Sequence, residues 1–226
     1  REIVSRLVPE LASEGVTLFV RVNDMETGLT EEDVSFAVQK GTYGITLPMT
    51  RGPEDVKAID ELITSEERKK GIEHGSVLID PGLETATGMR FAYDVGISSE
   101  RVAHMGAGGG RGGDIARAIG YRWTAMGTET LFIRSKVLLD SRAAGVPYPT
   151  TGLWQDIHDH EGLRAFANHS RDLGYNGMTV IHPSHVPIVN EIFSPSREEI
   201  EEWQGLVEAM RETRESGGAA VSYQGG

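Results

Sequence analysis

Short apolar runs alternate with amphipathic segments along most of this chain. Residues 16–23 are rich in β-branched and apolar side chains and predict a buried strand. The segment before it, residues 1–14, places apolar residues at helical spacing and predicts a helix. The same reading predicts further strands over residues 44–49, 76–80, 102–106, 148–153 and 178–181.

Amphipathic segments between and after these strands predict helices. Thr30 with Asp33 predicts a capped start for the first, and Ser196 with Glu199 predicts a capping box for the last. The charged run over residues 66–70 indicates a solvent-exposed face or a mobile loop. The predicted helices cover residues 30–40, 53–70, 86–95, 127–144, 161–173 and 196–214.

Strands that alternate with helices over short connections predict an α/β fold with parallel strands. A (β/α) barrel and a doubly wound sheet both fit this pattern, and periodicity does not separate them. In either architecture the functional side chains gather at the carboxyl ends of the strands. We therefore expect the site among the residues that follow these strands.

Composition narrows the class of protein. The 226 residues, 38% hydrophobic and 25% charged, are typical of one large globular domain. Twenty-two basic residues against 34 acidic ones give a net charge of -12, which argues against a nucleic-acid partner. The absence of Cys excludes disulfides, thiolate metal sites and a Cys nucleophile. With no long apolar run and no leader-like start, we expect a cytoplasmic protein without a membrane partner.

Two carboxylates stand just after predicted strands. Glu84 follows the strand over residues 76–80, and Asp114 closes the glycine-rich segment that follows the strand over residues 102–106. Two carboxylates from neighbouring strand ends can hold one hard divalent cation such as Mg²⁺, with coordination positions left for water and substrate oxygens. The sequence therefore predicts a metal site suited to carbonyl chemistry.

Motifs spread over the whole chain resemble one known family. They are Arg21-Val22-Asn23, Leu47-Pro48, Glu84-Thr85-Ala86-x-Gly88, Asp114-Ile115-Ala116, and Ile181-His182-Pro183 continuing to Ser194-Pro195. Together they resemble the citrate lyase β-subunit and malyl-CoA lyase family, within the HpcH/HpaI aldolase superfamily. The stretch over residues 181–195 carries the strongest likeness.

This resemblance implies a TIM-type (β/α) barrel that breaks or forms a carbon–carbon bond next to a CoA thioester. It implies Mg²⁺ as cofactor, held by Glu84 and Asp114, and a catalytic arginine, Arg21, that binds substrate carboxylate and enolate. It also implies an acyl-CoA thioester and a 2-oxo acid as partners, and a closed homo-oligomer such as a trimer. From the residues themselves, Gly110 and Arg111 could cradle a substrate anion and Met49 could line an apolar wall.

The chain departs from the family pattern in four respects. We expect a barrel domain over residues 1–195 that lacks the first two strand–helix units, followed by a helical extension over residues 196–226. Residues 219–226 resemble the run that leads into a C-terminal Asp-bearing segment, and we expect the chain to lack that segment. Met49 and Thr151 replace a Lys and an Asp of the family, and a glycine-rich loop over residues 108–113 replaces a short acidic turn.

The sequence is also compatible with other functions. A class II aldolase acting on hydroxy-keto acids without CoA is one, and a non-catalytic acyl-CoA-binding homologue is another. The spacing Gly108-x-Gly110-x-x-Gly113 also matches a dinucleotide-binding fingerprint. That match is weak, because no acidic residue ends a following strand at the required distance.

Overall fold

The computed structural model describes residues 1–218 and 223. The described part has six short strands, one in each predicted strand segment. Most of the segment over residues 219–226, discussed above for its family resemblance, lies outside the described residues. The strands are β1 (Phe19–Arg21), β2 (Gly44–Leu47), β3 (Leu78–Pro81), β4 (His104–Met105), β5 (Tyr148–Thr151) and β6 (Gly177–Met178).

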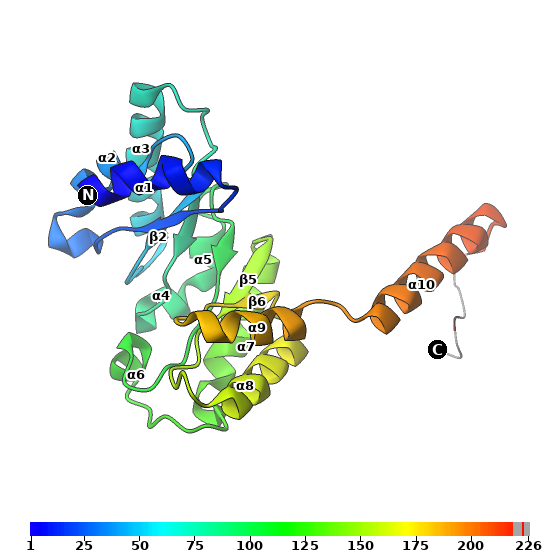
Figure 1. Cartoon of the computed structure of the whole chain (residues 1–226). Helices are drawn as coiled ribbons and strands as arrows, with labels where there is room; N and C mark the ends of the chain where they lie inside the picture. Colours follow the sequence, from blue (N-terminus) through cyan, green and yellow to red (C-terminus); the bar gives the residue numbers. More distant parts are fainter. Residues whose placement is uncertain (219–222, 224–226) are drawn as a thin grey trace.

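Helices connect these strands, and an additional helix pair follows the last one. The predicted α/β alternation is therefore confirmed. In Figure 1, α1 to α3 lie around β1 to β3, and α7 to α9 lie beside β5 and β6. The helices are α1 (Glu2–Ser13), α2 (Thr30–Ala37), α3 (Pro53–Lys70), α4 (Ala86–Arg90), α5 (Ala92–Gly96), α6 (Asp114–Ile119), α7 (Thr128–Ala143), α8 (His160–Leu173), α9 (Val186–Phe193) and α10 (Arg197–Glu215).

The strands pair in parallel and in chain order. They form two three-stranded sheets, β1-β2-β3 and β4-β5-β6. A parallel bridge between Ile79 and Val102 joins the two sheets across β3 and β4. Within the described residues, β1 and β6 each pair along one edge only. Because all pairs are parallel and consecutive, the carboxyl ends of neighbouring strands meet at one edge.

Two clusters of buried apolar side chains stabilise the fold. The larger packs β1 to β4 against α2, α3 and α5, with Ile45, Ile59 and Ile79 fully buried. The smaller lies around α8 and α9, where Leu163 is fully buried and Trp154 nearly so. Burial of this apolar surface is the main stabilising contribution to the fold.

The predicted cap at Thr30 is wrong. Leu29 occupies the N-cap position of α2, and no side chain caps the helix there. Thr30 instead donates a hydrogen bond to the Asn23 carbonyl (3.0 Å), and Asp33 accepts one from the Asn23 backbone N–H (2.9 Å). Both polar groups are thus used to fix the chain that leaves β1, which local sequence rules do not anticipate.

The charged run over residues 66–70 is only in part the exposed face that its composition indicates. It forms the last turns of α3, where Arg68, Lys69 and Lys70 are exposed, whereas Glu66 and Glu67 are buried, at 8% and 1% exposed. Glu67 accepts two hydrogen bonds from the Arg101 guanidinium, at 2.8 and 2.6 Å. A distant arginine therefore allows the burial of a carboxylate that would otherwise require solvent.

A predicted helix is broken in its middle, and an observed helix was not predicted. The segment over residues 86–95 is broken at Phe91 into α4 and α5. The helix α9, which follows Pro183, was not predicted. The capping box at Ser196 and Glu199 is confirmed at the start of α10.

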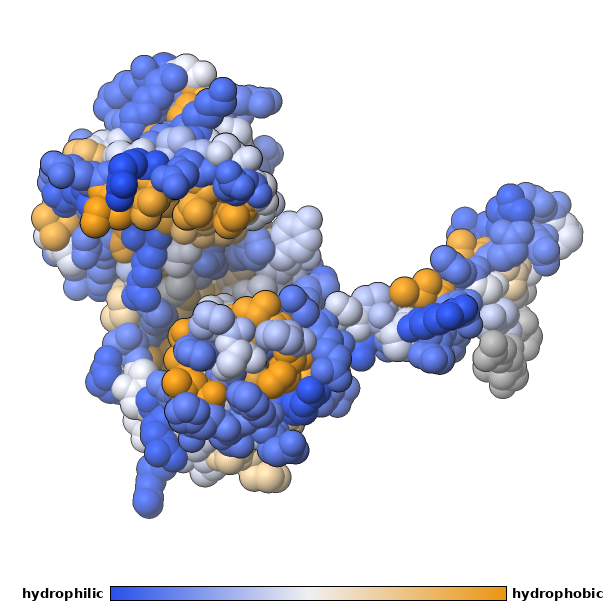
Figure 2. Space-filling model, viewed as in Figure 1, coloured by the Kyte–Doolittle hydropathy of each residue, from blue (hydrophilic) through white to orange (hydrophobic). Residues whose placement is uncertain are grey.

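The helix α10 extends away from the rest of the molecule (Figure 1). None of its residues is buried, and Trp203 and Val207 are 52% and 66% exposed. Figure 2 shows apolar side chains along this helix among many charged ones. Within the described residues, no helix combines the length and apolar character needed to span a bilayer.

Candidate active site

A cavity of about 340 Å³ lies at the carboxyl ends of the strands. Its wall combines residues of β1, β2, β3 and β5 with residues that follow β3, β4, β5 and β6. The polar and charged lining residues are Arg21, Thr46, Asp80, Glu84, Asp114, Thr150, Thr151, Gln155 and Thr179, and five glycines of residues 106–113 together with Gly82 and Gly152 complete much of the wall. Three residues predicted as catalytic, Arg21, Glu84 and Asp114, thus line one cavity.

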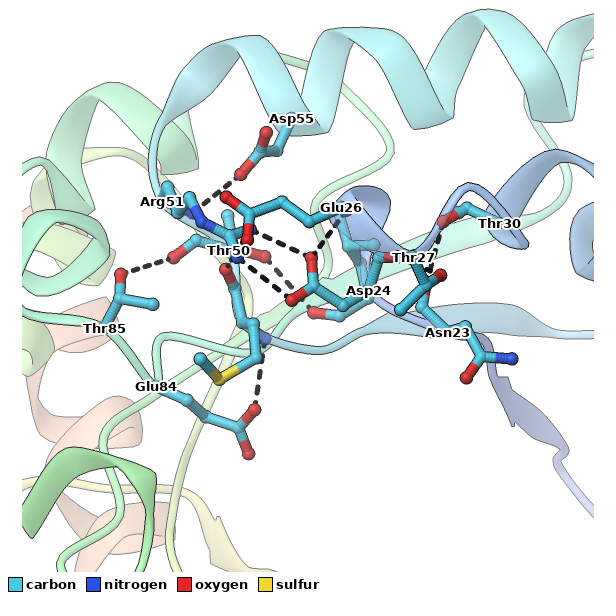
Figure 3. Close-up of polar contacts among 12 residues, drawn as sticks. Asn23, Asp24, Glu26, Thr27, Thr30, Thr50, Arg51, Asp55, Glu84 and Thr85 are labelled. Carbon is cyan, nitrogen blue, oxygen red and sulfur yellow. Dashed lines mark hydrogen bonds and ion pairs between the residues drawn. The ribbon is translucent and has the colours of Figure 1, made fainter. Parts of the chain in front are cut away.

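Glu84 is held in place by neighbouring loops. Its Oε2 accepts a hydrogen bond from the Met49 backbone N–H (3.1 Å), drawn in Figure 3. The Arg21 guanidinium, at the end of β1, lies 4.0 Å from the same oxygen. Arg21 is 64% and Glu84 31% exposed, so both side chains reach the opening rather than the core. The pair places a cation and an anion side by side at the cavity wall.

A second network positions the loops around Glu84 (Figure 3). Arg51 donates hydrogen bonds to both Asp24 oxygens, at 2.9 and 3.0 Å, and forms an ion pair with Glu26 (2.9 Å). These contacts tie the loop after β2 to the loop after β1. Thr85 Oγ1 donates to the Thr50 carbonyl (3.0 Å), which ties the same loop to the one after β3. Three successive strand ends are therefore cross-linked beside the site.

The backbone at two positions is constrained by this arrangement. Among the described residues, Met49 is the non-glycine residue with a positive φ (54°), a conformation that side chains with a Cβ rarely adopt. This conformation accompanies the hydrogen bond from its N–H to Glu84. At Gly88, a Cβ would approach the Thr50 carbonyl oxygen to 2.1 Å, so α4 can pack against the loop only without a side chain there.

Asp114 stands in the first turn of α6, after the glycine-rich loop. Its carboxylate pairs with Arg117 one turn later (2.5 Å), and Arg117 also donates to the Gly112 carbonyl (2.7 Å). The Asp114 side chain is 42% exposed. The structure thus gives Asp114 a cationic partner of its own, separate from the Arg21–Glu84 pair.

The glycine-rich loop forms the wall on this side. Gly110 lines the cavity, whereas Arg111 and Met49 are not among its lining residues. Arg111 lies over the Trp123 ring at 4.9 Å, and its carbonyl accepts a hydrogen bond from Gln155 (3.2 Å). The substrate-binding roles of Gly110, Arg111 and Met49 stay predictions.

Asp80 is a cavity residue that sequence reasoning missed. It lies within β3 opposite Thr46 of β2 and accepts a hydrogen bond from Thr46 Oγ1 (3.1 Å). Burial raises the pKa of Asp80, the Thr46 hydrogen bond lowers it, and the neighbouring charge of Glu84 raises it; together they bring the pKa to about 6. The available signal was an Asp at the last position of a predicted strand, where polar side chains reach the site.

The raised pKa of Asp80 predicts a measurable effect of pH on stability. Because the folded pKa lies above the ordinary value of 3.8, protonation favours the folded state. The resulting contribution is complete below pH 4 and is lost as pH rises through 6. Asp80→Asn cannot ionise at this position. We therefore expect the difference in free energy of unfolding, variant minus wild type, to increase by about 2 kcal/mol between pH 4 and 7, since one pKa unit corresponds to about 1.36 kcal/mol.

Urea unfolding in buffers without divalent cations measures this difference. The exposed Asp94→Asn, on α5, is the matched control and should follow the wild-type curve. Parallel pH curves for Asp80→Asn and wild type would contradict the burial of an ionisable group at this position.

The donor chemistry of the cavity suits a hard cation. Glu84 and Asp114 offer carboxylate oxygens, the ligands that Mg²⁺ prefers, and one or two carboxylates are its usual protein contribution. Among the described residues, no group of three Asp, Glu, His or Cys side chains is arranged to hold a metal ion. A cation at this cavity would have Glu84 and Asp114 as carboxylate ligands and would keep its other coordination positions for water and substrate.

Comparisons with known proteins agree with the family resemblance. The sequence model of the HpcH/HpaI aldolase/citrate lyase family matches residues 1–183. Citrate lyase subunit β of Haemophilus influenzae is 26% identical over 225 residues, covering 100% of this chain and 76% of the relative. L-malyl-CoA/β-methylmalyl-CoA lyase of Rhodobacter capsulatus is 28% identical over 228 residues, covering 92% and 70%.

Solved structures show the same fold. A citrate lyase from Burkholderia xenovorans LB400 superposes with a TM-score of 0.76 at 19% identity, covering 92% of this chain and 66% of that one. Protein CitE from Mycobacterium tuberculosis, in complex with magnesium, acetoacetate and coenzyme A, superposes with a TM-score of 0.64 at 23% identity, covering 92% and 71%.

These relatives support an enzyme of the lyase or aldolase type. The matched residues include β1 to β6 and the three carboxylates of the cavity, Asp80, Glu84 and Asp114. The chain therefore belongs to the HpcH/HpaI aldolase/citrate lyase family.

Proposed function

We propose that this protein is a Mg²⁺-dependent carbon–carbon lyase acting on a short 3-hydroxyacyl-CoA thioester of the citryl-CoA or malyl-CoA type. The observation that carries the proposal is the convergence of Arg21, Glu84 and Asp114 on one cavity at the strand ends. The names of the curated relatives, and the magnesium and coenzyme A in the CitE complex, support the same class.

In the cleavage direction, the bond between carbons 2 and 3 of the thioester breaks. The electron pair passes to carbon 2, giving the thioester enolate, while the 3-hydroxyl loses its proton and becomes the carbonyl of a 2-oxo acid. Protonation of the enolate then releases the acyl-CoA. Condensation is the reverse path. Negative charge on oxygen is thus the feature that the cavity must stabilise.

The residues of the cavity match this need. Arg21 offers a guanidinium that can donate two hydrogen bonds to a carboxylate or an enolate oxygen. Glu84 and Asp114 would hold Mg²⁺, which when bound supplies positive charge next to the reacting oxygens. The Met49 N–H orients Glu84, and the glycine-rich loop lets the backbone approach the substrate closely.

For the fold, we propose that the six parallel strands are part of a TIM-type (β/α) barrel. The consecutive parallel order of β1 to β6 and the position of the cavity at their carboxyl ends support this. We further propose a domain over residues 1–195, a helical extension over residues 196–226 and a homo-oligomer such as a trimer in the cytoplasm. The exposed apolar side chains of α10 are consistent with a subunit contact.

The test is cleavage of a malyl-CoA-type thioester by the purified protein, followed by chromatography of the CoA species. We expect turnover with Mg²⁺, loss with EDTA and recovery when Mg²⁺ is added back. The free hydroxy acid is the matched substrate that lacks the thioester, and it should not be cleaved. Calorimetric titration should show one Mg²⁺ site per chain.

Two other results would each contradict the proposal. Equal cleavage of the free acid and the thioester would indicate a class II aldolase that works without CoA. Binding of acyl-CoA without Mg²⁺-dependent turnover would indicate a non-catalytic homologue. The loss of catalysis would then be attributed to Met49 and Thr151, which stand in place of the family's Lys and Asp.

A further inference from the structure

Two polar side chains of the cavity have no part in the proposed metal site. Thr46 and Asp80 belong to strands, and they stand opposite each other in the β2–β3 register. Arg21 is the last residue of β1 and stands opposite Thr46 in the same register row, whereas Glu84 and Asp114 lie beyond the ends of β3 and β4. Thr46 and Asp80 therefore line the cavity from the strands, in the same row as Arg21.

Asp80 keeps hydrogen-bonding capacity. A carboxylate can accept about four hydrogen bonds. Within residues 1–218 and 223, the structure shows one to Asp80, from Thr46 Oγ1 to Oδ2 (3.1 Å). Because Asp80 also lines the cavity, a ligand can reach this remaining capacity.

Asp80 is not placed as a third metal ligand beside Glu84 and Asp114. No three Asp, Glu, His or Cys side chains are grouped closely enough to hold one cation, in the part of the chain that the structure describes. The Asp80 side chain is partly exposed at the cavity and already accepts a hydrogen bond from Thr46, and a donor on a bound substrate could use its remaining acceptor capacity.

The size of the cavity decides which part of the substrate that is. About 340 Å³ is near the lower end of small-molecule sites and far too small to enclose coenzyme A. The nucleotide portion must lie outside, so the small acid fragment is the part that enters the cavity. A hydroxyl on that fragment could donate a hydrogen bond to Asp80.

We propose that Thr46 and Asp80 select a 2-oxo acid that carries a hydroxyl group beyond its carbonyl carbon over the same acid without it. This inference rests on the proposed function and names the substrate class of that site. Sites that hydrogen-bond a substrate hydroxyl discriminate strongly against the analogue that lacks it, because the buried polar group then loses its partner.

The test compares hydroxypyruvate with pyruvate, which differ by one hydroxyl group, in condensation with acetyl-CoA and Mg²⁺. For the wild type we expect kcat/KM to be on the order of a hundredfold higher with hydroxypyruvate. Asp80→Leu, close to Asp in shape but without an acceptor, should lose this preference. Asp80→Asn, which keeps one acceptor oxygen, should reduce it, and the exposed Asp94→Asn on α5 should retain it.

The failures of the two proposals are distinguishable. Equal kcat/KM for both acids in the wild type overturns the selection by Asp80 and leaves the proposed lyase function standing. If neither acid is condensed, cleavage of the malyl-CoA-type thioester decides the lyase function, and calorimetric binding of each acid with Mg²⁺ present decides the selection alone. Tighter binding of hydroxypyruvate that is lost in Asp80→Leu supports it, and equal affinities overturn it.

Discussion

Replacing Glu84 with glutamine is expected to lower kcat/KM for thioester cleavage by about a thousandfold, the scale of losing a major electrostatic contribution to a transition state. The carboxylate lies beside the Arg21 guanidinium at 4.0 Å and accepts the Met49 N–H at 3.1 Å. The amide oxygen of the introduced glutamine can still accept that hydrogen bond, so the loop should keep its conformation. What the variant loses is the negative charge that the proposed cation requires.

Two measurements on Glu84→Gln separate a lost metal site from a misfolded protein. Mg²⁺ affinity by calorimetry should fall together with turnover, while the urea unfolding midpoint should change little. Glu31→Gln, an exposed carboxylate in the first turn of α2, is the matched control and should retain both properties. Unchanged Mg²⁺ affinity and unchanged turnover in Glu84→Gln would remove Glu84 from the site.

A second large effect is expected away from the cavity, at Arg101. This side chain is 5% exposed, and all five of its N–H groups donate hydrogen bonds. Its acceptors are Asp60, Thr64, the Val77 carbonyl and both oxygens of Glu67. Burial raises the pKa of Glu67, but hydrogen bonds from Arg101 and two backbone N–H groups outweigh it and hold the pKa below its ordinary value.

We expect Arg101→Met to destabilise the fold by about 3–5 kcal/mol, because it leaves the Glu67 carboxylate buried without its cation. That loss is a large part of a typical total stability of about 5–15 kcal/mol. The free energy of unfolding from urea denaturation, followed by circular dichroism, measures it. The double variant Arg101→Met with Glu67→Gln should be more stable than Arg101→Met alone, since no uncompensated charge remains.

The control is Arg164→Met, which removes an arginine from an exposed ion pair with Glu191 (2.9 Å). Exposed pairs contribute little, so its unfolding midpoint should stay near that of the wild type. If Arg101→Met behaves like Arg164→Met, or if adding Glu67→Gln gives no recovery, the buried pair does not hold α3 to the segment before β4.

The strand-end carboxylates show how far sequence reasoning reaches. Glu84 and Asp114 are 30 residues apart, yet each follows a predicted strand, and parallel strands bring their carboxyl ends to one edge. The prediction needed no knowledge of side-chain contacts. It did not give the separate partners of each carboxylate, Arg21 and Arg117, because the orientation of a loop depends on what packs against it.

Local rules failed where a distant group changed a residue's environment. Composition marks Glu67 as exposed, but Arg101, 34 residues away, makes its burial favourable. Thr30 has the sequence of a cap, but the Asn23 carbonyl takes its hydroxyl hydrogen bond. In both cases the competing partner lies outside the few residues that a local rule considers, 34 residues away for Glu67 and 7 for Thr30.

The sequence by itself determined the α/β class, the positions of the strands and the family, because hydrophobic periodicity and motifs are properties of short segments. Only the tertiary structure decided that Asp80 faces the cavity with Thr46, since that contact depends on the register between β2 and β3. It also decided which charged side chains are buried. Burial and partnership are set by packing between segments, and no short stretch of sequence contains that information.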